Sequence, residues 1–274
     1  MSVIQATSHR LEMVVNGIGN PLKPHLPHIG RFLLVVTFIE DAFRILMQWK
    51  EQLYFMQTYR HIPMGISHLF LLYNVLAMLI GSWLALTRIS TALACSLLTS
   101  VIVIQSLGYG LLSNVGFMLR NLSLLGGLIL MLNEPQGKQK FNLLPSLSES
   151  EKGTYFSLLG RILLICLTGS LLYNGMGHSN LGGLFKICAF ALALVSSFLV
   201  AIGFKARYSA VLLVSLLSLC NVIMNNWWSY HLNSPERDYM RYDFFQTLSI
   251  IGGFLLLVHS GPGNLSIDQK KKDF

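Results

Sequence analysis

Hydrophobic positions along this 274-residue chain gather in eight long runs separated by short polar segments. The runs cover about residues 31–49, 65–87, 90–112, 115–132, 157–174, 183–203, 207–229 and 243–260. A helix needs roughly 20 residues to cross a bilayer core about 30 Å thick, which is close to the length of each run. The pattern therefore predicts an all-α polytopic membrane protein with about eight transmembrane helices.

Composition supports this class. Hydrophobic residues make up 53% of the chain and charged residues only 12%, whereas soluble domains carry roughly 25% charged residues. The chain lacks the polar surface that a soluble fold of this size needs.

Two short patterns recur along the chain and indicate a duplication. GRFLLV at residues 30–35 returns as GRILLI at 160–165, and LSLLGGL at 122–128 returns as LSIIGGF at 248–254. One pair opens each half and the other closes it. Because four spans per half is an even number, the halves should share one orientation, related by an axis along the membrane normal.

The repeat and the runs divide the chain into five segments. These are an N-terminal segment at 1–28, a four-helix half at 29–132, a linker at 133–156, a second four-helix half at 157–260 and a tail at 261–274. Eleven Lys and Arg residues lie on the side of both termini and five lie on the opposite side. This bias places both termini, the linker and the tail in the cytosol. The net charge of +8 is mainly a topology signal, and no nucleic-acid partner is predicted.

The first run carries ionisable residues at its centre. Glu40 lies about 15 Å along the helix from Gly30, close to the bilayer midplane. Glu40, Arg44 and Gln48 are spaced four residues apart and share one helix face, with Asp41 beside it. This order predicts an ion pair between Glu40 and Arg44.

Polar residues of the other runs fall mostly in the lumenal half. They are Gln105, Arg120, Asn121, Asn221, Asn225, Asn226, Tyr242, Asp243 and Gln246. This asymmetry predicts a water-filled cavity open to the lumen, lined by the first, fourth, seventh and eighth runs. The alternative is an interhelical network that only holds the bundle together. Charges inside a membrane are rare and favour a functional site.

The candidate ligand-binding residues are therefore Glu40, Asp41, Arg44, Gln48, Arg120, Asn121, Asn225, Asp243 and Gln246. Trp227 and Trp228 are typical of an interfacial aromatic anchor. The four cysteines lie in apolar runs without paired spacing, and no metal site or cofactor is predicted. The sequence has no nucleophile–base motif, and we do not predict an enzyme.

The C-terminus carries a second candidate signal. Lys271 and Lys272 stand fourth and third from the end, which is the spacing of the dilysine signal that the COPI coat reads to return membrane proteins to the endoplasmic reticulum. The alternative is a basic tail attracted to anionic lipid.

The chain resembles the surfeit-4 family of endoplasmic reticulum cargo receptors over nearly its whole length. The matching stretches are residues 27–31, 38–41 with Arg44 and 48–49, 118–122, 200–205, 241–247, and the tail from 261–263 to 270–272. The halves differ at the charged cluster, because residues 167–170 (LTGS) stand where the first half has its acids. Any site is therefore asymmetric.

The resemblance implies a receptor that binds soluble secretory proteins in the lumen, enters COPII vesicles and returns through COPI. Family cargo signals are short hydrophobic peptides near a mature N-terminus or in a propeptide. We expect Glu40 or Asp41 to engage the positive group of the cargo, with Arg44 and Arg120 setting the charge balance. The cargo's identity and any homo-oligomer stay open.

Two other functions are candidates for a helix bundle of this kind. A polar stripe in a helix bundle could pass lipid headgroups, which would make the protein a phospholipid scramblase, but the stripe's restriction to the lumenal half argues against a path between both leaflets. The four-span halves also resemble small quinone-pathway membrane proteins, for which the sequence supplies no redox or haem chemistry.

Overall fold

The computed structural model describes residues 24–133, 155, 158–163, 165, 183–202, 206–231 and 234–260. Within these residues the chain forms helices and no β-strand, which confirms the predicted all-α class. In chain order the α-helices are α2 (Leu26–Met47), α3 (Trp49–Thr58), α4 (Met64–Thr87), α5 (Thr91–Gly108), α6 (Val115–Leu132), α8 (Gly183–Ile202), α9 (Ala206–Met224) and α10 (Pro235–Ser260). The 3-10 turns η1 (Leu111–Ser113) and η2 (Trp227–Ser229) follow α5 and α9.

Five helical stretches among the described residues are long and apolar enough to cross a membrane. They are Met64–Thr87, Thr91–Gly108, Val115–Leu132, Tyr208–Ser229 and Glu236–Ser260. Helix α2 is of similar length, with 22 residues, but contains Arg31, Glu40, Asp41 and Arg44. The predicted run at 157–174 lies mostly outside the described residues, so that a total of eight spans stays a prediction.

The first predicted run, residues 31–49, forms one helix, and a second, short helix follows it. Helix α2 begins at Leu26, with a proline in its first turn where the missing N–H costs no hydrogen bond. It ends at Met47, because Gln48 leaves helical geometry with φ −103° and ψ 29°. The short helix α3 follows, and Met56 is its only buried residue. The hydropathy pattern did not predict α3, because this helix has only a small apolar face.

The last helix begins earlier than its hydrophobic run. The run predicts residues 243–260, but α10 already starts at Pro235, with Glu236 and Asp238 in its first turn. Proline and acids favour a helix N-terminus, since they suit its free N–H groups and its dipole. Arg237 and Arg241 therefore lie on α10 and not in the loop before it.

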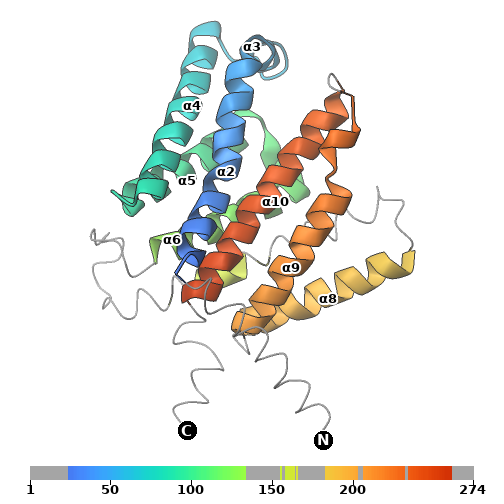
Figure 1. The fold of residues 1–274 in the computed structure, drawn as a ribbon. Coiled ribbons are helices and arrows are strands. Elements are labelled where there is room, and N and C mark those ends of the chain that lie inside the picture. Colours follow the sequence, from blue (N-terminus) through green and yellow to red (C-terminus); the bar gives the residue numbers. More distant parts are fainter. Residues whose placement is uncertain are drawn as a thin grey trace, which may run out of the picture.

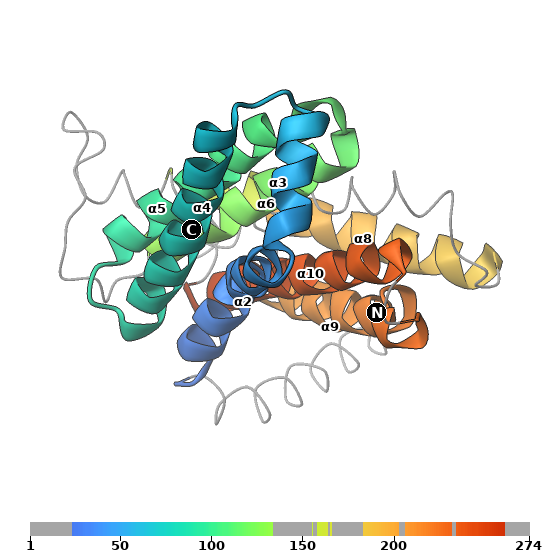
Figure 2. The same ribbon diagram turned by 90° about the horizontal axis from the view of Figure 1, so that it is seen from above.

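Helices α2 and α10 form the centre of the bundle and pack against each other (Figures 1 and 2). On one side of this pair α4 packs on α2 and α5 packs on α4. On the other side α9 packs on α10 and α8 packs on α9. Helix α6 contacts both α5 and α10 and closes the bundle behind the central pair. Buried hydrophobic residues from α2, α4, α5, α6, α8, α9 and α10 form one continuous core.

The central helices cross at glycines. A Cβ atom at Gly252 of α10 would lie 2.5 Å from the backbone nitrogen of Leu34 and 2.6 Å from the carbonyl oxygen of Gly30. Across this crossing a Cβ at Gly30 would lie 2.9 Å from Leu256 and 3.2 Å from the Gly252 carbonyl oxygen. Only glycine allows the two backbones to approach so closely.

The second copy of the repeat makes the matching contact with α6. A Cβ atom at Gly160 would lie 2.7 Å from Leu130 and 3.1 Å from the carbonyl oxygen of Gly126. In the two repeated motifs Gly160 corresponds to Gly30, and Gly126 corresponds to Gly252. The helix that opens each half thus packs on the helix that closes the other half.

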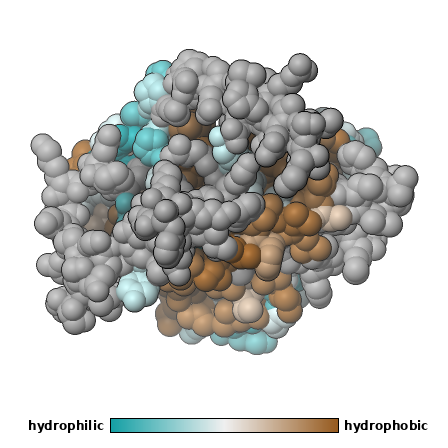
Figure 3. All heavy atoms as spheres, turned by 90° about the horizontal axis from the view of Figure 1, so that it is seen from below, coloured by the Kyte–Doolittle hydropathy of each residue, from teal (hydrophilic) through white to brown (hydrophobic). Residues whose placement is uncertain are grey.

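The outer surface of the bundle is strongly apolar. Seen from below, the described residues present a broad hydrophobic area, with hydrophilic residues at several of its edges (Figure 3). Large side chains such as Leu69, Trp83 and Phe198 are about two-thirds exposed, at 67%, 65% and 64%. Such a surface suits contact with lipid.

Candidate functional site

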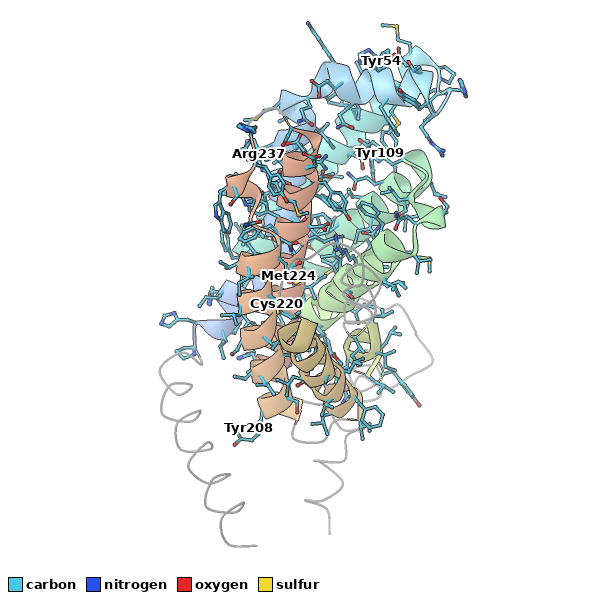
Figure 4. All side chains as sticks on the ribbon, turned by 90° about the vertical axis from the view of Figure 1, so that its right-hand side faces the viewer. Tyr54, Tyr109, Tyr208, Cys220, Met224 and Arg237 are labelled. Carbon is cyan, nitrogen blue, oxygen red and sulfur yellow. The ribbon has the colours of Figure 1, made fainter. Side chains whose placement is uncertain are left out.

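Most of the candidate residues meet at one end of the bundle. This is the end where α2, α5 and α9 finish and α6 and α10 begin. Tyr54, Tyr109 and Arg237 lie toward this end and Tyr208 toward the other (Figure 4). We call the contacts described next the polar network. It comprises Glu40, Asp41, Arg44, Gln105, Arg120, Asn121, Arg241, Asp243 and Gln246.

Asp41 is bound from two sides. Arg44, one turn further along α2, forms an ion pair with it, and the amide of Gln105 on α5 donates a hydrogen bond to its other oxygen at 2.7 Å. The guanidinium of Arg44 lies over the ring of Tyr242 on α10, 5.4 Å from the centroid. Asp41 and Arg44 thus join α2 to α5 and α10.

Glu40 has a different partner from the one its spacing predicts. Its carboxylate lies 3.0 Å from Nε of Arg241 on α10, and the side chain of Glu40 is only 4% exposed. The predicted ion pair between Glu40 and Arg44 is wrong, because Arg44 forms its ion pair with Asp41 instead. The competing acid is the residue next to Glu40, which helical spacing alone could not rank against it.

Arg120 and Asp243 form a second buried ion pair, which joins α6 to α10. Their side chains are 7% and 6% exposed. One turn deeper, Gln246 donates to the amide oxygen of Asn121 at 3.3 Å, and Asn121 donates to the hydroxyl of Ser106 at 3.0 Å. This chain of contacts connects α5, α6 and α10 across the bundle.

The two remaining candidates bind at the edge of the network. Gln48 donates to Asp238 in the first turn of α10 at 2.8 Å. Asn225 donates to Asn221 at 2.7 Å, and Asn221 donates to the carbonyl oxygen of Phe244 at 3.1 Å. These contacts fix the end of α2 and the end of α9 to α10.

Aromatic side chains lie beside the polar network at this end of the bundle. The guanidinium groups of Arg237 and Arg241 lie 5.1 and 5.8 Å from the ring centroid of Trp227. On the opposite flank, Tyr109 donates a hydrogen bond to Gln52 at 2.9 Å. Burial, and after it the charge of Asp41, raises the pKa of Tyr109, so that its hydroxyl stays protonated at neutral pH.

The structure therefore brings together residues that the sequence placed only in the same half of the membrane. It adds three that the candidate set missed, namely Gln105, Asp238 and Arg241. Gln105 had been placed at the right depth. The helix-start signature at Pro235 was the signal that could have put Asp238 and Arg241 on α10.

Several predictions concern parts of the chain beyond this network. The dilysine pair Lys271 and Lys272 and most of the linker lie outside the described residues. The water-filled cavity stays a prediction. In the described part of the chain no group of His, Cys, Asp and Glu is placed to hold a metal ion.

Comparison with known proteins identifies relatives along nearly the whole chain. Residues 5–274 match the model of the SURF4 family. The Surfeit locus protein 4 homolog of Schizosaccharomyces pombe is 43% identical over 256 residues, which cover 92% of this chain and 83% of the relative. No solved structure matches the chain.

Two further relatives match a similar share of the chain. The ER-derived vesicles protein ERV29 of Saccharomyces cerevisiae is 35% identical over 261 residues, 94% of this chain and 80% of the relative. The Surfeit locus protein 4 homolog of Drosophila melanogaster is 35% identical over 249 residues, 90% of each chain. This chain therefore belongs to the SURF4 family.

Proposed function

We propose that this protein is a cargo receptor of the early secretory pathway. It binds soluble secretory proteins in the lumen of the endoplasmic reticulum, packages them into COPII vesicles and returns through COPI. Membership of the SURF4 family and a relative named for ER-derived vesicles support this role. The proposal assigns transport to the protein and no chemical reaction.

The membrane architecture in this proposal is a duplicated bundle of eight spans, with both termini in the cytosol and segment boundaries at 28, 132, 156 and 260. The matching glycine contacts of the two halves support it. So does a pair of buried arginines, since Arg31 and Arg161 occupy the same place in the repeat and are 1% and 0% exposed. The polar network then lies at the lumenal end.

Glu40 is the residue to which we assign the positive group of the cargo. Asp41 is already held by Arg44 and Gln105, and Asp243 by Arg120. Glu40 is 5% exposed, and neither of its carboxylate oxygens makes a hydrogen bond. A buried carboxylate without hydrogen bonds is costly and gains most from a new donor. This is the observation that carries the proposal.

A charge-neutralising substitution tests the assignment. Glu40→Gln keeps the size of the side chain but removes its charge, and we expect slower export of soluble cargo from cells that carry only this variant. Glu51→Gln on the exposed face of α3 is the matched control, which should export normally. Pulse–chase secretion of several cargo proteins measures both. A folded Glu40→Gln variant that exports every cargo at the normal rate would contradict the assignment.

Phospholipid scrambling is the alternative for the same fold. A headgroup path has to carry polar groups into both leaflets, but the buried charges at the opposite end, Arg31 and Arg161, are sealed inside protein. Arg31 donates to the carbonyl oxygen of Ala85 at 3.1 Å. Lipid-flip assays on the purified protein in liposomes separate the two functions, because a receptor should flip no more lipid than protein-free liposomes do.

A further inference from the structure

Glu40 differs from the other acids of the polar network because its carboxylate accepts no hydrogen bond. Asp41 and Asp243 each have an ion pair with hydrogen-bond geometry. Glu40 is equally buried, but its oxygens and the Nε of Arg241 all lack hydrogen bonds, although Nε lies 3.0 Å from Oε1. Within the described residues the charge of Glu40 is therefore offset only by nearby guanidinium groups, those of Arg44 and Arg241.

Arg241 is also the more accessible member of the pair. Its side chain is 30% exposed, against 4% for Glu40. Arg241 thus reaches the protein surface, whereas Glu40 is enclosed. A cation that binds Glu40 has to compete with this guanidinium, which lies 3.0 Å from the Glu40 carboxylate.

The guanidinium of Arg241 has a second partner beside Glu40. Its Cζ lies 5.8 Å from the centroid of the Trp227 ring. A guanidinium is attracted to the electron-rich face of an indole ring, even at an exposed site. Arg241 can therefore leave Glu40 and keep a favourable contact, which lowers the cost of its displacement.

We propose that Arg241 is an internal stand-in for the ligand's cation. Together with Arg44 it offsets the charge of Glu40 while the site is empty, and the free amino group of a bound peptide displaces it toward Trp227. This inference rests on the proposed function and deepens it by naming how the same site is regulated. The ligand class is a peptide with a free α-amine, because a small ammonium group can donate the hydrogen bonds that Glu40 lacks.

Displacement of Arg241 predicts a different effect on peptide affinity than a structural salt bridge between Arg241 and Glu40 does. Arg241 competes with the ligand, so removing its charge should strengthen peptide binding. If Arg241 instead contacted the ligand or held the site in shape, removing it would weaken binding. The direction of the change therefore separates the two roles.

Fluorescence polarisation on the full-length protein in lipid nanodiscs measures this direction. The probe is an octapeptide with a free amino group, three apolar residues at its N-terminus and fluorescein at its C-terminus. We expect Arg241→Gln to bind it about five- to tenfold more tightly, the gain from removing a competing ion pair of modest strength. Lys50→Gln, which removes an exposed positive charge from the same end, is the control and should bind like the parent protein.

Two further measurements keep the test decisive. Arg241→Lys keeps a cation beside Glu40 and should bind within about twofold of the parent protein, since only loss of the competing charge releases Glu40. The N-acetylated probe should bind equally weakly to all variants. Thermal unfolding in nanodiscs verifies that each variant is folded.

The outcomes also distinguish this inference from the proposed function. If Glu40→Gln weakens binding of the free-amine probe while Arg241→Gln weakens it or leaves it unchanged, the stand-in role is overturned and the Glu40 assignment stands. If neither substitution alters binding of the free-amine probe, both the stand-in role and the Glu40 assignment fail.

Discussion

At the residue scale, most contacts of the polar network hold helices together. Glu40 is different, because its buried carboxylate accepts no hydrogen bond. Arg120 and Asp243 are buried against each other and join α6 to α10. Mutual neutralisation offsets the cost of removing both charges from water, but the pair gains little beyond that. Removing only one of the two charges destabilises the protein strongly, because the other charge is left without a partner inside the bundle.

We predict that Asp243→Asn destabilises the protein by about 3–5 kcal/mol, since it strands the charge of Arg120. Thermal unfolding of the purified protein in detergent measures this loss. The double variant Arg120→Met with Asp243→Leu should regain most of the stability. Glu236→Gln, at an exposed position in the first turn of the same helix, is the control. Equal stability of Asp243→Asn and the parent protein would show that the pair is unimportant.

Depth along each span was predictable at this scale, but pairing was not. Counting residues along each run places Glu40 near the middle of its run and Arg120 and Gln246 toward the same end of theirs. Which acid takes which arginine depends on the rotation of each helix about its axis, and Arg44 could reach either Glu40 or Asp41 by spacing. Only the packing of α10 against α2 decides this, by bringing Arg241 to Glu40.

At the element scale, the bundle depends on glycines that let helices touch. The repeated GG motifs were visible in the sequence, and the structure places one of them at the crossing of α2 and α10. Helix–helix association in a membrane gains from such close approach, because small residues increase backbone contact. Helix existence was predictable from hydropathy, whereas α3 and the first turns of α10 were not, since their polar residues carry no apolar signal.

We predict that Gly252→Val prevents α2 and α10 from packing, because its Cβ alone would lie 2.5 Å from a backbone nitrogen of α2. The variant should accumulate at a small fraction of the normal level and elute as aggregate in gel filtration. Gly65→Val is a matched control, since a Cβ atom there meets no other atom within 4 Å. Normal gel filtration of Gly252→Val would contradict the crossing.

At the scale of the whole molecule, the repeat organises the bundle and the charges break its symmetry. The helix that opens each half packs on the helix that closes the other, through equivalent glycines. The first half has acids at 40 and 41, whereas the second has no acid at 167–170. Among the described residues the buried acids thus gather at one end of the bundle, which suits one ligand site there.

Retrieval of the protein to the endoplasmic reticulum is a property of the whole molecule, and substitutions in the tail test it. We predict that replacing Lys271 and Lys272 with Ser shifts the protein from the endoplasmic reticulum to the Golgi and later membranes, as imaging of the tagged protein in cells will measure. Lys270→Ser should leave the distribution unchanged, because it lies outside the two required positions. An unchanged distribution of the double variant would contradict a dilysine signal.

The most direct measurement for the central claim is site-specific photocrosslinking of a peptide with a free amino group. Photoreactive residues at Tyr239, beside the polar network, and at Ile29, at the opposite end, sample positions of similar exposure, 43% and 40%. We expect crosslinks at Tyr239, their loss in Glu40→Gln, and none at Ile29. Crosslinks at Ile29, or crosslinks at Tyr239 that persist in Glu40→Gln, would contradict a ligand site centred on Glu40.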